Sequence, residues 1–173
     1  LNEEDINLML DDKLFSQYLA NYNRNLTPTA IIRLFSMSKK LLSYLAGNYH
    51  LSEESCVVLA EKVLELGETD RILENVNLPS KYLLPLFKLS SNVNKIHRDR
   101  YFRNHNWTFD DLWTVLTEFP EYCKEIIAHQ NFQNKEKLQA ALSQEYDLNV
   151  DLPLTYMLEF IEATYNVELN STS

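Results

Sequence analysis

Residues 104–108, Asn-His-Asn-Trp-Thr, carry a five-residue pattern that recurs along the chain. An Asn, any residue, usually a second Asn, a large apolar residue and a helix-starting residue follow one another in this order. The pattern recurs near 23–27, 48–52, 75–79, 104–108, 130–134 and 149–153, and the copy at 130–134, Gln-Asn-Phe-Gln-Asn, is degraded. Because most intervals match the length of two short helices with their turns, the sequence predicts a helical repeat protein.

Apolar residues recur four, seven and eight positions after each helix-starting residue, a spacing that places them on one face of an α-helix. The sets are Ile31, Leu34 and Phe35; Cys56, Leu59 and Ala60; Leu83, Leu86 and Phe87; Leu112, Val115 and Leu116; Leu138, Ala141 and Leu142; Met157, Phe160 and Ile161. One helix pair cannot bury such a stripe alone, so neighbouring pairs must supply the core. We therefore expect an all-α fold, a right-handed α-solenoid of about five to six stacked short helix pairs.

The helix map that follows from the repeat places one domain over 1–165 and a flexible C-terminal tail over 166–173. Its helices are expected near 4–11, 12–21, 28–37, 39–46, 53–66, 68–74, 80–90, 97–103, 109–117, 121–129, 134–144 and 153–164.

Each part of the turn pattern has a mechanical reason. Thr27, Ser52 and Thr108 are preferred N-cap residues, whose side-chain oxygen accepts a hydrogen bond from the first turn of the helix. The large residue before them can pack across the turn. The repeated Asn follows an apolar helix end, where either a left-handed closing residue or a side-chain bond to the turn backbone is wanted. The Asn is therefore expected to close one helix and shape the turn into the next.

This combination of an apolar helix end, Asn-x-Asn-Leu-Ser/Thr and then Leu-x-x-Leu-Ala resembles the leucine-rich repeat variant and HEAT-like α-solenoid families. The resemblance covers roughly residues 14–163. It implies stacked helix pairs and a surface that serves many kinds of partner. Two departures stand out: the fifth copy lacks the Asn and the leucine in register, and the Cys cluster that holds an iron–sulfur site in some variant-repeat proteins is absent from this sequence.

Composition excludes several classes of protein. Two Gly, five Pro and no alternating run of β-branched residues argue against a sheet protein. Cys56 and Cys123 form no CxxC pair, so we expect buried free thiols rather than a disulfide framework or zinc site. No apolar run would span a bilayer. The segment 1–12 is acidic where a secretory signal would be basic and then apolar, so we expect a cytoplasmic protein that does not enter a membrane.

One basic segment interrupts an acidic chain. The formal net charge is -9, yet residues 94–107 hold four basic residues against one acidic residue. We take this segment as the candidate partner-binding site, formed by Lys95, Arg98, Arg100, Arg103, His105 and Trp107. Its arginines and aromatic residues could contact an acidic protein surface or the phosphates and bases of a nucleic acid. Alternatively, Tyr101 and Phe102 hold core positions of the repeat and the charges are simply its outer face.

Chemistry of other kinds has little support in the sequence. No set of His and Cys residues has a familiar zinc-ligand spacing, no glycine-rich phosphate loop exists, and the paired carboxylates all lie in first turns or exposed ends of expected helices. We therefore expect no catalytic residues, no metal and no cofactor. The leading interpretation is a non-catalytic scaffold that binds another protein, of unknown oligomeric state. The alternatives are a nucleic-acid-binding repeat protein that uses the basic segment, and an acidic decoy that blocks a basic protein.

Overall fold

The computed structural model describes residues 26–37, 41–48, 50–67, 71–90 and 98–171. Every secondary-structure element within these ranges is helical and none is a strand, which confirms the all-α fold. The helices expected near 4–11 and 12–21 lie outside the described residues. The chain divides into two compact units, residues 1–106 and 107–173.

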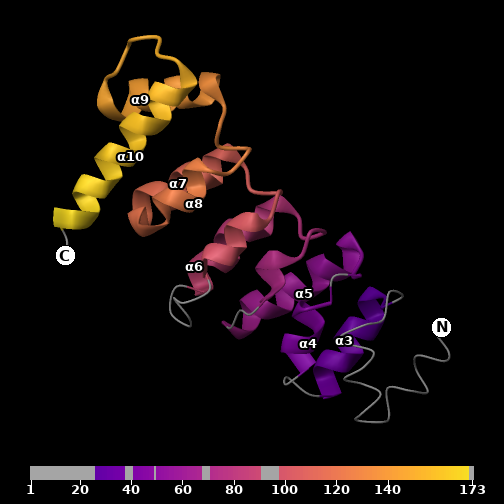
Figure 1. Cartoon of the computed structure of the whole chain (residues 1–173). Helices are drawn as coiled ribbons and strands as arrows, with labels where there is room; N and C mark the ends of the chain where they lie inside the picture. Colours follow the sequence, from indigo (N-terminus) through magenta and orange to yellow (C-terminus); the bar gives the residue numbers. More distant parts are fainter. Residues whose placement is uncertain (1–25, 38–40, 49, 68–70, 91–97, 172–173) are drawn as a thin grey trace. The chain divides into compact units, whose positions relative to one another are not determined.

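The described part of the first unit alternates a longer helix with a shorter element (Figure 1). In chain order these are α3 (Pro28–Met37), α4 (Leu42–Ala46), α5 (Glu53–Leu66), the 3₁₀ helix η2 (Arg71–Glu74), η3 (Ser80–Tyr82) leading into α6 (Leu83–Ser90), and the 3₁₀ helix η4 (Arg98–Arg103). The longer helices are neighbours, with α3 against α5 and α5 against α6. The shorter elements are neighbours too, with α4 against η2 and η2 against η4. Two rows of elements therefore run through this unit.

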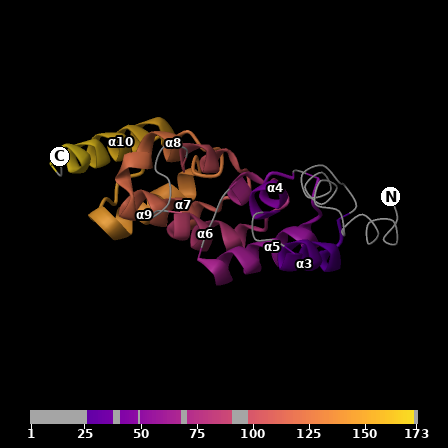
Figure 2. The same ribbon diagram turned by 90° about the horizontal axis from the view of Figure 1, so that it is seen from below.

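The second unit contains α7 (Phe109–Glu118), η5 (Pro120–Tyr122), α8 (Cys123–Ile127), α9 (Lys135–Tyr146) and α10 (Leu154–Ser171). Helix α7 packs against η5 and α8, and α10 packs against η5, α8 and α9. Figure 2 shows α10 alongside α8. The apolar stripe at the start of α10 is the one that the first, longer helix of each pair carries. Helix α10 nevertheless packs mainly against η5 and α8, which are shorter elements. Helix α10 also continues to Ser171, beyond the expected end near 164, so residues 166–171 are helical.

The shorter elements differ most from the sequence-based map. The segment expected as a helix near 97–103 is a 3₁₀ helix over 98–103, and the one expected near 121–129 is split into η5 and α8. Short segments gain few hydrogen bonds for the residues that they order, so tight 3₁₀ turns are frequent in them, although α4 and α8 remain α-helical.

The predicted stripe forms the core of both units. All of its residues in the described helices are buried except Phe35, Ala141 and Phe160, which are half-buried. Cys56 is fully buried among these stripe residues, in agreement with its assignment as a core thiol.

The predicted N-caps are confirmed. The Thr27 Oγ1 accepts a hydrogen bond from Ala30 N at 3.2 Å. Ser52 and Thr108 accept equivalent bonds from the backbone N–H three residues on, each at 3.2 Å. Asn134 caps α9 in the same way, at 3.1 Å from Lys137 N. Each cap satisfies one of the orphan donors of a helix start.

Buried asparagines link successive turns of the first unit. The Nδ2 group of Asn75 donates to the Asn48 carbonyl at 2.9 Å, and that of Asn104 donates to the carbonyls of Asn75 at 3.0 Å and Leu73 at 2.9 Å. Within each turn the same side chains accept a backbone N–H two residues on, as Asn104 Oδ1 does from Asn106 N at 2.9 Å. The sequence left two roles open for the first Asn, a left-handed closing residue or a side-chain bond to the turn backbone. The structure shows the side-chain bond.

The second Asn of the pattern forms a parallel row. Asn77 Nδ2 donates to the Leu51 carbonyl at 2.7 Å, and Asn106 Nδ2 donates to the Leu78 carbonyl at 2.8 Å. We call the two rows together the asparagine ladder. Since each rung joins residues that are 26 to 31 positions apart in the chain, the ladder fixes the spacing between one turn and the next.

The fifth turn carries the pattern in a different register from the one predicted at 130–134. His129 Nδ1 accepts the Asn131 backbone N–H at 3.0 Å, as the first Asn does in other turns, and Asn131 Nδ2 donates to the Trp107 carbonyl at 2.8 Å. Phe132 is fully buried in the place of the large apolar residue. The pattern therefore begins at His129, and one extra residue, Gln133, precedes the cap Asn134.

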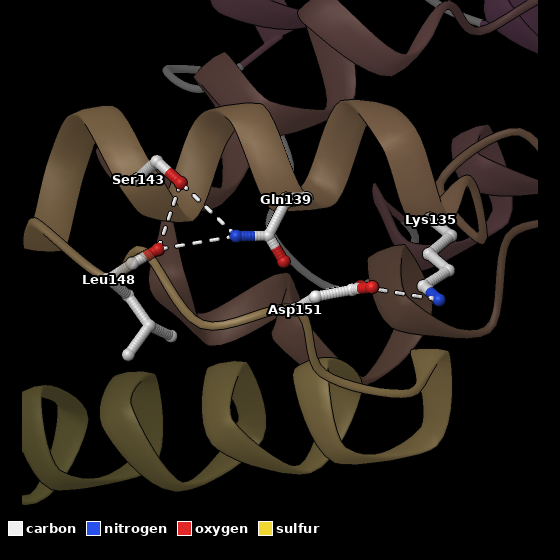
Figure 3. A network of polar contacts seen from close by, with 5 residues as sticks. All are labelled: Lys135, Gln139, Ser143, Leu148 and Asp151. Carbon is white, nitrogen blue, oxygen red and sulfur yellow. Dashed lines mark hydrogen bonds and ion pairs between the residues drawn. The ribbon is translucent and has the colours of Figure 1, made fainter.

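The sixth copy forms a loop of another kind. Asn149 is exposed, and the loop is tied to α9 by side chains of that helix instead (Figure 3). Ser143 Oγ donates to the Leu148 carbonyl at 2.8 Å, and Gln139 Nε2 donates to the same oxygen at 3.3 Å. Lys135 Nζ forms an ion pair with Asp151 at 3.3 Å.

Candidate functional site

The predicted partner-binding residues fall into three groups. Lys95 lies outside the described residues, and only the backbone of Arg98, the first residue of η4, is described. Arg100, Arg103 and His105 have exposed side chains. Trp107 is fully buried, so its assignment to a partner contact is wrong. Its indole fills the core position that Leu51 and Leu78 hold in earlier turns.

Arg100 and Arg103 share one side of η4. Side chains three residues apart eclipse one another in a 3₁₀ helix, so the two guanidinium groups project together. Neither forms an ion pair with another residue in the described part of the chain. We call these two residues the arginine pair.

The residues between the two arginines anchor η4 to the core. Phe102 is buried with its ring centroid 5.3 Å from that of Phe87, and half-buried Tyr101 meets the same Phe87 ring edge-on at 6.5 Å. Asn104 directly follows the element and carries two rungs of the asparagine ladder. The core role considered for Tyr101 and Phe102 therefore fits the structure, and these aromatic rings hold the arginine pair in place rather than offering a stacking surface.

A groove between α7 and α9 is a second candidate, which the sequence-based reasoning missed. It has a volume of about 400 Å³ and is lined by Phe109, Asp110, Trp113, Thr114, Lys137, Ala140, Ala141, Gln144 and Glu145. The one sequence signal was Trp113, a large aromatic residue next to the predicted stripe rather than on it. All of these residues belong to the second unit.

Charge is divided between the two units. Residues 1–106 contain thirteen acidic and thirteen basic residues, whereas residues 107–173 contain twelve acidic and three basic residues. The whole net charge of -9 therefore belongs to the second unit.

Burial, as the largest cause, raises the pKa of Asp111 in this unit, and Asp110 adds to the effect, while the hydrogen bond with Thr108 lowers it.

The two thiols are poorly suited to nucleophilic chemistry. Burial, with a smaller contribution from Glu53, raises the pKa of Cys56 to about 12. Burial, followed by Glu162 and Glu125, raises the pKa of Cys123 to about 11. Both cysteines are free and buried. Because the thiolate is the reactive form, neither sulfur has the character of an activated nucleophile.

Within the described ranges, no group of three or more His, Cys, Asp and Glu side chains is arranged to hold a metal ion. No helix there combines the length and apolarity needed to cross a membrane. Comparison of the chain with protein-family models, curated proteins and solved structures finds no match.

Proposed function

We propose that this chain is a non-catalytic scaffold of α-solenoid repeats, of the kind seen in leucine-rich repeat variant and HEAT-like proteins, and that it binds a partner protein. Two features support the repeat architecture. Longer helices neighbour longer helices in the first unit while shorter elements neighbour shorter ones, and the asparagine ladder repeats the same bonds from turn to turn. Repeats of this kind present continuous surfaces suited to partner binding.

The arginine pair is the observation that carries the binding proposal. Arginine is enriched at protein interfaces, where its planar guanidinium forms paired hydrogen bonds to carboxylates. Here two exposed arginines lie on one side of an element that is held by Phe102 and Asn104. Because these contacts hold the backbone of η4, the spacing of the two arginines along it is set before a partner binds, which lowers the cost of ordering the site. The partner surface that fits it carries carboxylates.

Affinity capture with matched variants tests this proposal. The native chain and a Lys62→Glu/Lys81→Glu control are expected to recover the same partner from the source lysate, whereas Arg100→Glu/Arg103→Glu is expected to lose it. The control makes the same change in net charge elsewhere in the first unit. Arg100→Lys/Arg103→Lys keeps the charge but removes the guanidinium forks, so partial recovery is expected. Equal recovery by all four proteins would contradict the proposal.

Nucleic-acid binding through the arginine pair is the second candidate, favoured by the exposure of both guanidinium groups. It predicts a band shift with single-stranded or duplex DNA at low salt that fades as salt rises, because phosphate contacts release counterions. The buried Trp107 and Phe102 leave fewer aromatic rings for base stacking than the sequence suggested. A missing shift at low salt would remove this candidate.

The acidic decoy is the third candidate, and the division of charge favours it, since the second unit carries the entire net charge of -9. A basic partner captured by this mechanism would be released by salt. It would also be retained by Arg100→Glu/Arg103→Glu, which leaves the second unit unchanged. The same capture experiment therefore separates a carboxylate-bearing partner from a basic one.

A further inference from the structure

Phe109 and Trp113 form the aromatic floor of the groove between α7 and α9, and Phe132 packs in the core beside them. The rings of Phe109, Trp113 and Phe132 lie nearly parallel, with interplanar angles of 14° to 17° and centroid separations of 5.2 to 6.3 Å. Phe132 is fully buried and Phe109 is 6% exposed, whereas Trp113 is half-buried. Trp113 therefore presents the largest aromatic surface to a molecule that enters the groove.

Charged side chains stand along the groove. Asp110 on α7 and Glu145 on α9 are exposed, and neither is paired with a cation in the ranges that the structure describes. Lys137 also lines the groove, with Nζ 6.0 Å from the centroid of the Phe109 ring. An ammonium group already lies at the aromatic floor, as expected for the negative face of a π system.

We propose that this groove binds an arginine-containing, positively charged segment of a partner protein. A guanidinium of the bound segment stacks on Trp113, and positive charges of the segment form ion pairs with Asp110 and with Glu145. Charge complementarity carries the choice of occupant: the unit bears a net charge of -9, so its field attracts a basic segment and repels an acidic one. This inference rests on the proposed partner-binding function but uses another surface than the arginine pair.

Lys137 gives the proposal a distinctive consequence. Its ammonium group has the same sign as the bound segment and lies within the same groove, so it opposes binding. Replacing it with Gln removes that repulsion while leaving its backbone N–H, which Asn134 caps, in place. Removal of a residue that lines the groove is then expected to tighten binding, which a purely structural role of the groove would not produce.

Fluorescence anisotropy with a labelled hexa-arginine peptide tests the proposal on the full chain. The native protein is expected to bind this peptide more tightly than the matched citrulline peptide, which has the same shape without the charge. Asp110→Asn/Glu145→Gln should raise the Kd about tenfold. The control Glu159→Gln/Glu162→Gln makes an equal charge change at exposed residues of α10 and should raise the Kd less than about twofold. Trp113→Ala should raise the Kd about fivefold, and Lys137→Gln should lower it about threefold.

The outcomes separate this inference from the proposed function. If the two double carboxylate variants weakened peptide binding equally, the attraction would be to the acidic surface in general, and the proposal that the peptide binds in the groove would be wrong. An unchanged affinity of Lys137→Gln would overturn it as well, and that exposed substitution does not threaten the fold. Arg100→Glu/Arg103→Glu should bind the peptide as the native chain does. A groove that fails these tests leaves capture through the arginine pair unaffected, and the reverse also holds.

Discussion

The Asn104 side-chain amide donates a hydrogen bond of 3.0 Å to the main-chain carbonyl of Asn75, its counterpart one turn earlier. Asn104 is 3% exposed, and its side chain also bonds to the Leu73 carbonyl and the Asn106 N–H. One side chain therefore satisfies three backbone groups from two turns. Buried backbone groups that lose their partners pay a desolvation cost, which makes the asparagine ladder a structural element in its own right.

Asn104→Ala is expected to lower the free energy of unfolding by about 2 kcal/mol, because the Leu73 carbonyl and the Asn106 N–H lose this side chain, while the Asn75 carbonyl keeps the Leu78 N–H. Chemical denaturation of the native and variant chains measures the change. Asn149→Ala is the matched control, since Asn149 holds the same position of the pattern but is exposed. Its effect should stay within about 0.5 kcal/mol. Equal effects of the two substitutions would contradict the ladder.

His129→Asn is expected to be tolerated, with a change within about 1 kcal/mol, because an Asn side chain can accept the Asn131 N–H as His129 Nδ1 does. His129→Leu keeps an apolar body of similar size but removes the acceptor, and it should cost about 2 kcal/mol. Thermal unfolding of both variants compares them. If Leu proved as stable as Asn at this position, the assignment of His129 to the turn pattern would be wrong.

Both thiols are expected to resist labelling in the native protein. Burial raises the pKa of Cys56 to about 12 and that of Cys123 to about 11, so little thiolate forms at neutral pH and access is poor. A chromogenic disulfide reagent should label neither thiol on the timescale at which it labels both in denaturant. Variants Cys56→Val and Cys123→Val assign any residual reaction. Rapid labelling of the native chain would show that a cysteine is exposed.

Stability should fall in alkaline solution. Burial raises the folded-state pKa of both cysteines above the ordinary value of 9.0, and it also raises the pKa of Tyr82. The unfolded chain therefore releases these protons first. The stabilisation is complete below pH 9.0 and is lost as pH rises toward 11 and 12.

Denaturant midpoints measured across this pH range test the expectation. The Cys56→Val/Cys123→Val variant should lose part of the alkaline decline, and Tyr82→Phe should lose a further part. A native chain whose stability stayed constant up to pH 11 would contradict the raised pKa of the two buried cysteines.

Local features were accessible to sequence reasoning. Thr27, Ser52 and Thr108 cap their helices as predicted, because an N-cap bond joins residues three apart and needs no other part of the chain. The buried stripe was equally predictable, since helical periodicity alone places residues on one face. The register of the fifth turn was not predictable, because His129 takes the place of the first Asn. Its Nδ1 accepts the same backbone hydrogen bond, although the residue type is different.

The candidate sites were less predictable than the helices. The exposure of Arg100 and Arg103 agrees with their assignment to an outer face, but Trp107 looked like an interface residue and is a core residue. Residue type gives only a preference for burial, and the neighbours decide it. The groove could not be predicted from the sequence, because it is lined by Phe109 and Trp113 of α7 together with residues of α9, and helical periodicity does not say that these two helices share a groove.

Sequence periodicity and capping residues were enough to predict that the described part of the chain is helical, where the helices capped by Thr27, Ser52 and Thr108 begin, and which face of the longer helices is buried. These properties depend on residues no more than eight positions apart. Three features depend on how the chain folds back on itself: which turn each Asn side chain bonds to, the packing of α10 against η5 and α8, and the groove that Trp113 lines with Asp110 and Glu145. A periodic pattern specifies a face, whereas the partner of that face depends on chain segments far away in the sequence.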